Sequence, residues 1–242
     1  MSKSNITMFF PAYNEEENIP KLLNSATKIL EEVADNYEIL VIVYEGSTDN
    51  TIDIVKKFVK KNNKIKLLIQ PRDKKGVGYA KIMGFKNAKY QYIFYADSDN
   101  QFNLYEFKKF LPYIDKYDII AGYRIKRCDP KGRIIISKLY NAMMRLLFDV
   151  HERDLDCAFR LVNKKIIEDI NLICHTGVAT TELLAKARKN GFKIKEVGVS
   201  HYPRKLGKPI FELERLSLPK PKVIVDILKE ITKLWFDIHR KK

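Results

Sequence analysis

The amino-acid sequence predicts an α/β fold with a mostly parallel central sheet flanked by helices. Short apolar segments alternate with longer ones in which apolar residues recur every three or four positions, the pattern of strands and amphipathic helices. Polar motifs directly follow three of the apolar segments. Ligands of such sheets bind beyond the carboxyl ends of the strands, so we expect the three motifs at one edge of a Rossmann-like sheet.

The first half of the chain carries this alternation most clearly. It predicts strands at 6–10, 38–44, 65–69, 92–96 and 118–121, and helices at 18–33, 49–61 and 78–88. The second half predicts a basic loop at 123–132, a helix at 134–148, a strand after 154–160, a helix near 181–190 and a strand near 193–201. No repeat or linker divides the chain, which predicts one domain over 1–210 and a C-terminal amphipathic helix within 211–242.

The composition is that of a globular protein with a basic excess. Hydrophobic residues make up 45% of the 242 positions, and 45 Lys and Arg against 30 Asp and Glu give a net charge of +15. This charge favours anionic partners, but no segment combines basic and aromatic residues as a nucleic-acid-binding surface does, so we expect no nucleic-acid partner. The three cysteines lack C-x-x-C spacing, which predicts neither a disulfide framework nor a zinc site and favours a cytoplasmic location. No apolar run reaches the roughly 20 residues of a spanning helix, so membrane contact is expected to be peripheral, on the inner face.

The strand predicted at 92–96 leads directly into Asp97-Ser98-Asp99-Asn100-Gln101. Two carboxylates one residue apart at a strand end offer oxygen ligands that suit Mg²⁺ or Mn²⁺ together with a bound phosphate. Asp, Ser and Asn also form ordinary turns, so this pair alone does not decide between a metal site and a polar turn. The two other strand-end motifs, 11–16 and 45–49, favour the metal site.

Six segments together resemble the family-2 glycosyltransferases with the GT-A fold, and within them the branch that contains dolichol-phosphate mannose synthase. The resemblance covers roughly residues 5–210 and rests on segments 11–16, 45–51, 76–84, 97–101, 154–160 and 204–208. It implies a metal-dependent, inverting transfer of a sugar from a nucleoside diphosphate sugar, with a polyprenyl phosphate as the expected acceptor. It also implies a divalent cation, Mg²⁺ or Mn²⁺, as cofactor.

The resemblance implies three sets of donor-binding residues. The nucleoside set is Pro11, Tyr13, Glu15, Val43 and Glu45. The metal set is Asp97, Asp99 and Gln101, and the remaining contacts to the nucleotide sugar are Ser98, Arg124 and Lys208. Relatives usually have two aspartates where this chain has Tyr44-Glu45, so base recognition is expected to shift with the longer side chain. The alternative for Glu45 is a solvated turn residue.

The residues expected to act in catalysis are Asp97, Asp99, Asp154 and Arg204. In family members that glycosylate alcohols, an acidic residue removes the acceptor proton. A phosphate acceptor is already an anion, so the role of Asp154 stays open between a general base and a group that orients the acceptor or nearby arginines. The basic loop 204–208 is expected to fold over the diphosphate and screen the leaving-group charge, against the alternative of a solvent-exposed loop.

The segment 222–238 places apolar residues, including Trp235, at helical spacing and leads to a basic terminus at 240–242. Such a stripe must be covered, and three placements are open. It could pack on the catalytic domain, form a homodimer or lie in a membrane interface. Acidic residues mixed with the lysines of its polar face weaken the membrane alternative, so packing on protein is expected.

Two rival functions remain. One is transfer to a saccharide acceptor. The other is a sugar-phosphate nucleotidyltransferase, which has a Gly-rich, Arg-containing phosphate loop after the first strand. This chain has Pro11-Ala12-Tyr13-Asn14 there, which favours the glycosyltransferase.

Overall fold

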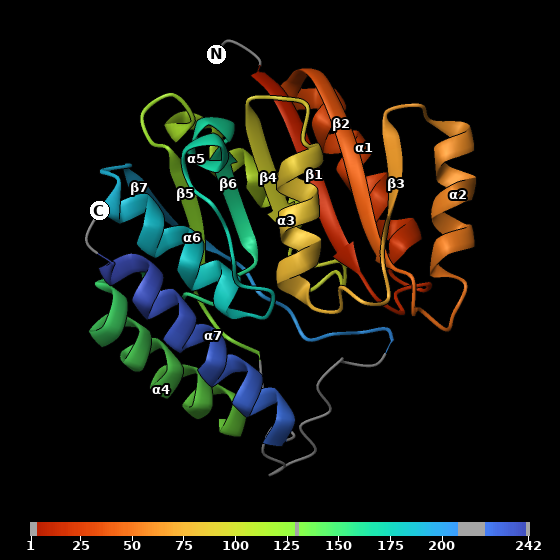
Figure 1. Cartoon of the computed structure of the whole chain (residues 1–242). Helices are drawn as coiled ribbons and strands as arrows, with labels where there is room; N and C mark the ends of the chain where they lie inside the picture. Colours follow the sequence, from red (N-terminus) through yellow and green to blue (C-terminus); the bar gives the residue numbers. More distant parts are fainter. Residues whose placement is uncertain (1–3, 129–130, 208–220, 241–242) are drawn as a thin grey trace.

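The computed structural model describes residues 4–128, 131–207 and 221–240, which form a seven-stranded sheet between layers of helices (Figure 1). The strands are β1 (Ser4–Ala12), β2 (Ala34–Tyr44), β3 (Ile65–Gln70), β4 (Tyr92–Ala96), β5 (Ile119–Arg124), β6 (Phe159–Asn163) and β7 (Ile194–Val199). Their order in the sheet is β3-β2-β1-β4-β6-β5-β7. The pairings are parallel except those of β6, which is antiparallel to β4 and β5. The predicted α/β fold with a mostly parallel sheet is therefore confirmed.

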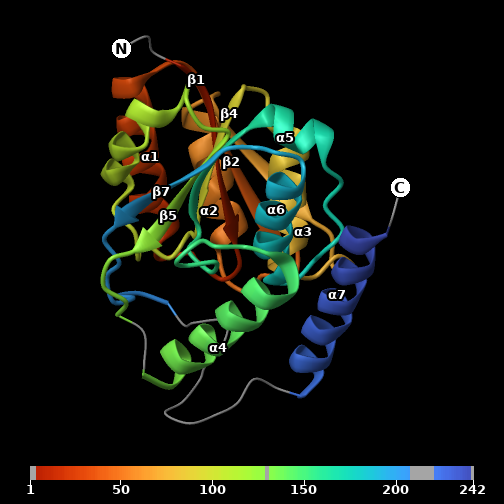
Figure 2. The same cartoon turned by 90° about the vertical axis from the view of Figure 1, so that its left-hand side faces the viewer.

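Helices cover both faces of this sheet. The helices of the described ranges are α1 (Ile19–Val33), α2 (Thr51–Lys61), α3 (Val77–Asn87), α4 (Lys131–Phe148), α5 (Lys164–Asp169), α6 (Val178–Lys189) and α7 (Pro221–His239), with 3-10 turns η1 (Leu104–Lys109) and η2 (Leu111–Tyr113). Helices α3 and α6 lie on one face, and α1 lies on the other (Figures 1 and 2). The short α5 and the two 3-10 turns were not predicted, because segments of three to six residues are too short to show helical periodicity.

The sheet separates two apolar cores. Along β1, Ile6, Met8 and Phe10 join the core shared with α1, whereas Phe9 faces the core shared with α3. Strand side chains alternate between the two faces, and both faces are covered, so the strand reads as a continuous apolar run. Gly84 on α3 permits this packing, since a Cβ there would lie 2.6 Å from the Phe9 ring.

Helix α7 packs against α6 and α4. Its buried residues Ile231 and Leu234 join the core, and Glu230 accepts hydrogen bonds from the backbone N–H groups of His175 (2.6 Å) and Thr176 (3.0 Å). One side of the apolar stripe thus packs on protein, as expected. The predicted boundary at 210 lies outside the described residues. Within the described ranges, no helix combines the length and apolar character needed to cross a membrane.

Candidate active site

The carboxyl ends of β1, β2 and β4 bring the three polar motifs together at one edge of the sheet. Strands β1 and β4 are adjacent and parallel, with Phe9 opposite Tyr95, so the residues after each strand become neighbours. The Ser98 hydroxyl donates to the Pro11 carbonyl at 2.8 Å and ties the first motif to the acidic one. The Thr48 N–H donates to Asn14 Oδ1 at 2.8 Å and ties the first motif to the second. The predicted convergence of the motifs is therefore present.

Arg204 lies between two carboxylates at this edge. Its Nη2 donates to both oxygens of Glu15, at 2.9 and 2.8 Å, and its Nη1 lies 3.7 Å from Asp99 Oδ2. Glu15 is only 4% exposed and also accepts from Asn18 Nδ2 at 2.7 Å. Burial raises the pKa of Glu15, although the hydrogen bonds from Asn18 and the charge of Arg204 oppose that rise. Glu15 and Asp99 together hold the Arg204 guanidinium at this edge of the sheet.

The acidic motif suits a cation that also binds the donor. Asp97 and Asp99 are partly exposed at the end of β4, and Asp99 Oδ1 accepts from the Gln101 N–H at 3.1 Å. Gln101 uses its amide nitrogen to donate to the Tyr202 carbonyl at 2.9 Å. Among the described residues, no three His, Cys, Asp or Glu side chains gather into a cluster that would hold a metal. A divalent ion at Asp97 and Asp99 would therefore complete its shell with phosphate oxygens and water.

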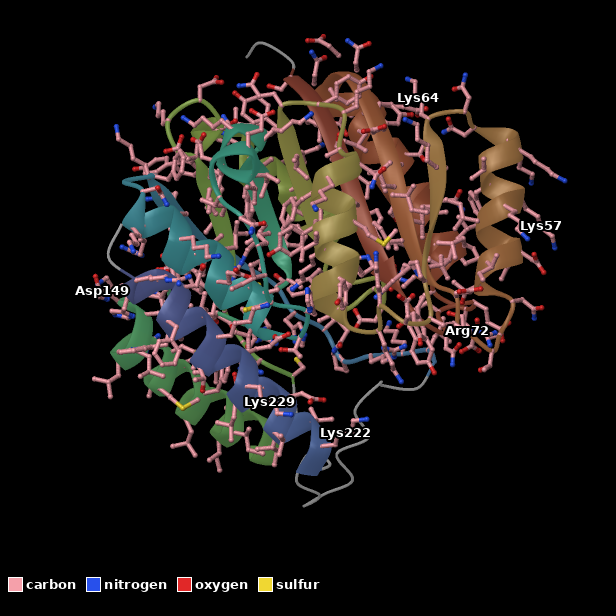
Figure 3. The ribbon with its side chains drawn as sticks, in the orientation of Figure 1. Lys57, Lys64, Arg72, Asp149, Lys222 and Lys229 are labelled. Atoms are coloured by element: carbon pink, nitrogen blue, oxygen red, sulfur yellow. The ribbon has the colours of Figure 1, made fainter. Side chains whose placement is uncertain are left out.

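The nucleoside set lines the edge beside these carboxylates. The rings of Tyr13 and Tyr44 lie 5.7 Å apart in an edge-to-face arrangement. Glu45 is exposed, and its Oε2 accepts from the Arg72 N–H at 3.2 Å, with Arg72 at the same edge (Figure 3). Val43 is fully buried in the core, so its side chain is not available to a nucleotide. Lys208 lies outside the described residues.

We expect Glu45→Gln to weaken binding of the nucleoside diphosphate on the order of tenfold, because an amide replaces an acceptor that pairs with base or ribose donors. Stability should not change, since Glu45 is exposed. Calorimetry on both proteins measures the effect, with Glu168→Gln, on the exposed side of α5, as the control. Equal affinities would leave Glu45 as a turn residue.

The antiparallel strand β6 brings the second acidic segment to the site. Its first residue, Phe159, pairs with Ala96 at the end of β4, so the loop 154–158 lies at the same edge as Asp97. Asp154 forms a two-pronged ion pair with Arg124: Nε to Oδ2 and Nη2 to Oδ1 are both 2.7 Å. Both side chains are less than a tenth exposed. Burial alone would raise the pKa of Asp154, but the hydrogen bonds and charge of Arg124 outweigh it and hold that pKa below its usual range.

Near Asp154, the first half of α4 turns polar groups inward, whereas Met144 and Phe148 of its second half join the core. Arg127 Nη1 donates to the Ser137 hydroxyl at 2.7 Å, and that hydroxyl donates to Asp156 Oδ2 at 2.6 Å. Asn141, one turn further along α4, is 6% exposed. This chain of polar groups links α4 to the loop that carries Asp154.

Lys81 on α3 is a buried cation whose charge interacts with that of Asp97, and sequence patterns did not single it out. Its side chain is buried, and its Nζ donates to Thr180 Oγ1 at 2.6 Å. Burial lowers the pKa of Lys81 to about 8, with the charge of Asp97 opposing and that of Arg160 adding to the shift. A lysine between Gly78 and Phe85, on the buried stripe of the helix, was the signal available in the sequence.

The chain is similar to known proteins over most of its length. The family model described as glycosyl transferase family 2 matches residues 7–171. An uncharacterized protein of Methanocaldococcus jannaschii is 29% identical over 239 residues, which cover 93% of this chain and 97% of that protein. An undecaprenyl-phosphate 4-deoxy-4-formamido-L-arabinose transferase of Serratia proteamaculans is 25% identical over 212 residues, which cover 87% of this chain and 64% of that enzyme.

Solved structures share the fold. Glucosyl-3-phosphoglycerate synthase from Mycobacterium tuberculosis, in complex with Mn²⁺, uridine diphosphate and phosphoglyceric acid, superposes with a TM-score of 0.68 at 14% identity, over 97% of this chain and 78% of that chain. The same enzyme with Mg²⁺ and uridine diphosphate gives a TM-score of 0.66 at 16% identity, over 95% of this chain and 80% of that chain. These likenesses establish the architecture. With the family model matching well over half of its length, this chain belongs to glycosyl transferase family 2 and is a glycosyltransferase with the GT-A fold.

Proposed function

We propose that this protein transfers a sugar from a nucleoside diphosphate sugar to the phosphate of a polyprenyl phosphate, with inversion, at a membrane surface. The family assignment supports glycosyl transfer. The Serratia relative is named for an undecaprenyl-phosphate acceptor, which supports a lipid phosphate here. The mycobacterial neighbours were crystallised with uridine diphosphate and with Mn²⁺ or Mg²⁺, which supports a nucleotide donor and a divalent cation.

The donor half of this proposal rests on the edge shared by β1, β2 and β4. Tyr13 and Glu45 would hold the nucleoside, and Asp97 and Asp99 would hold a divalent cation, whose charge would offset that of the leaving diphosphate. Arg204 is held by Glu15 in the structure and lies beside Asp99. We expect its guanidinium to turn to the diphosphate when the donor enters, because a planar fork suits phosphate oxygens.

The ion pair between Arg124 and Asp154 is the observation that carries the acceptor half. A carboxylate with a lowered pKa and both oxygens bonded to a guanidinium is a weak base, so it is poorly suited to remove a proton from an alcohol. A phosphate acceptor needs no base. Its oxygen attacks the anomeric carbon, the bond to the diphosphate oxygen breaks, and the electron pair leaves with the nucleoside diphosphate. A single displacement of this kind inverts the anomeric centre.

A panel of nucleotide sugars, with and without Mn²⁺, tests the donor half through the melting temperature. Ligands that bind the folded state raise it by mass action. We expect the nucleotide sugars of one nucleobase to raise the melting temperature of the protein, and to raise it further when Mn²⁺ is present. No stabilisation by any member of the panel would count against the proposal.

A further inference from the structure

Helices α4 and α7 present a broad apolar surface to solvent. They pack against each other, and both views place them beyond the end of the sheet at which β1 terminates (Figures 1 and 2). The most exposed large apolar side chains of the pair include Leu146 (86%), Leu139 (67%) and Phe236 (62%). We define the α4–α7 surface by Ile135, Leu139, Leu146, Leu228, Trp235 and Phe236. Exposed apolar patches of this kind mark interaction sites.

Helix α4 carries apolar residues on two faces: Met144 and Phe148 are buried in the core, and a second apolar stripe faces solvent. Its polar residues Ser137 and Asn141 are buried against the site, and its apolar residues at 135, 139 and 146 are exposed. These three positions follow one another by four and seven residues, so they share one face. A surface helix normally buries its apolar stripe. A second apolar stripe that is left exposed favours an apolar partner for the outer face of α4.

The charges of the two helices favour an anionic partner. Between residues 131 and 148, α4 contains four Lys or Arg and no Asp or Glu. On α7, Glu230 accepts hydrogen bonds from the backbone N–H groups of His175 and Thr176. Asp237 forms an ion pair with Lys186 at 2.7 Å. Two of the three acidic residues of α7 are thus engaged with the body of the protein.

The remaining charged side chains around the surface are mainly basic. Lys138 on α4 is exposed, and Lys222 and Lys229 project from α7 (Figure 3). Asp149, just beyond α4, pairs with His151 at 3.0 Å. A second copy of the chain docked here would place like charges opposite one another, whereas a layer of anionic headgroups would attract them.

We propose that the α4–α7 surface docks on a bilayer that contains anionic lipids, with α4 and α7 lying in the interface. Apolar side chains enter the acyl boundary and lysines contact headgroups, as in other interfacial helices. The inference deepens the proposed function and rests on its lipid-phosphate acceptor.

The position of α4 explains why docking there would serve that reaction. Its outer face carries Leu139 and Leu146, while Ser137 on its inner face donates to Asp156 in the loop beside Asp154. A helix with its side chains is only about 10–12 Å across. A phosphate at the headgroup level is therefore held within a short distance of the acidic loop, and its polyprenyl chain stays in the bilayer.

Trp235 gives a direct readout, because it is the single tryptophan of the chain and belongs to the surface. We expect the whole protein to co-sediment with vesicles of phosphatidylcholine and phosphatidylglycerol, with a blue shift of Trp235 emission. Binding should fall as salt is raised, because exposed charges are screened over about 10 Å at 0.1 M ionic strength. Binding without a shift in Trp235 emission would place docking elsewhere and overturn the inference.

Leu139→Glu and, separately, Leu228→Glu should each lower the vesicle-bound fraction roughly tenfold, because a carboxylate replaces an inserted apolar side chain. The control is Asn24→Glu, which adds the same charge at an exposed position of α1, and it should bind as the unchanged protein does. Equal loss in the control, or no loss in either variant, would contradict docking through this surface. A dimer in solution that dissociates in Leu139→Glu would show instead that a second copy covers the surface.

Transfer to a short, water-soluble polyprenyl phosphate separates this inference from the proposed function. That acceptor needs no bilayer, so Leu139→Glu should use it as well as the unchanged protein does. Activity on the soluble acceptor without vesicle binding would contradict the docking inference and leave the proposed function standing. Vesicle binding through this surface without transfer to any polyprenyl phosphate would contradict the proposed acceptor and leave the docking inference standing.

Discussion

Replacing Asp99 by Asn should reduce turnover on the order of 10² or more, because it removes one of the two carboxylates that we propose hold the cation bound to the donor diphosphate. The side chain lies at the end of β4, with Arg204 Nη1 3.7 Å from its Oδ2. Asparagine keeps the size of the side chain and can still accept from the Gln101 N–H, so the fold should persist. Steady-state rates at saturating donor, across a series of Mn²⁺ concentrations, measure the loss.

Asp53→Asn is the matched control for Asp99→Asn. Asp53 lies on α2 in an exposed pair with Lys56, and exposed pairs contribute little to stability. Its variant should retain full turnover. The metal role of Asp99 would be refuted by an Asp99→Asn variant that keeps full activity, or by unchanged activity of the original protein in EDTA.

Arg204→Gln should also reduce kcat on the order of 10², because the leaving diphosphate loses the positive charge that we expect to turn toward it when the donor binds. Arg204→Lys retains the charge but not the two-pronged geometry, so we expect an intermediate rate. A solvent-exposed loop residue would show neither loss. The measurement is kcat and KM for the donor in both variants, with Lys57→Gln on the exposed side of α2 as the control.

The same Arg204 variants have a structural consequence that must be separated from catalysis. Glu15 is nearly buried, and Arg204 is its ion-pair partner, so Arg204→Gln leaves a buried carboxylate with fewer partners. Melting temperatures therefore accompany the kinetics. If turnover at a temperature where both variants are folded equals that of the original protein, Arg204 only stabilises the loop.

Local sequence patterns predicted the parts of the site that depend on strand ends. Asp97 and Asp99 follow a five-residue buried strand, and Tyr13 and Glu45 follow two others. In a parallel sheet these ends meet at one edge whatever the details of packing, so their convergence followed from the order of elements alone. The roles of these residues stay predictions.

Sequence patterns could not predict contacts between segments that lie far apart in the chain. Arg204 meets Glu15 across 189 positions, and Arg124 meets Asp154 across 30. No periodicity specifies such pairs, because they depend on how the loops pack. The orientation of α4 is a second example: its helical spacing was visible, but it has apolar residues on two faces, and its inner face contacts both the core and the polar loop at Asp156.

The direction of β6 shows the same limit. Strand–helix alternation predicts parallel neighbours, yet the chain leaves β5 through α4 at the site edge and enters β6 from that edge, with Phe159 opposite Ala96. Strand β6 is therefore antiparallel to its neighbours β4 and β5. This reversal is what delivers Asp154 to the site.

The most direct test of the account is transfer from the stabilising nucleotide sugar to a short polyprenyl phosphate, compared with the matching polyprenyl alcohol, with the anomeric configuration of the product determined by NMR. We predict metal-dependent formation of the glycosyl phosphate with inverted configuration, release of the nucleoside diphosphate, and little product from the alcohol. Equal use of the alcohol would contradict the phosphate acceptor, and retention of configuration would contradict the single displacement.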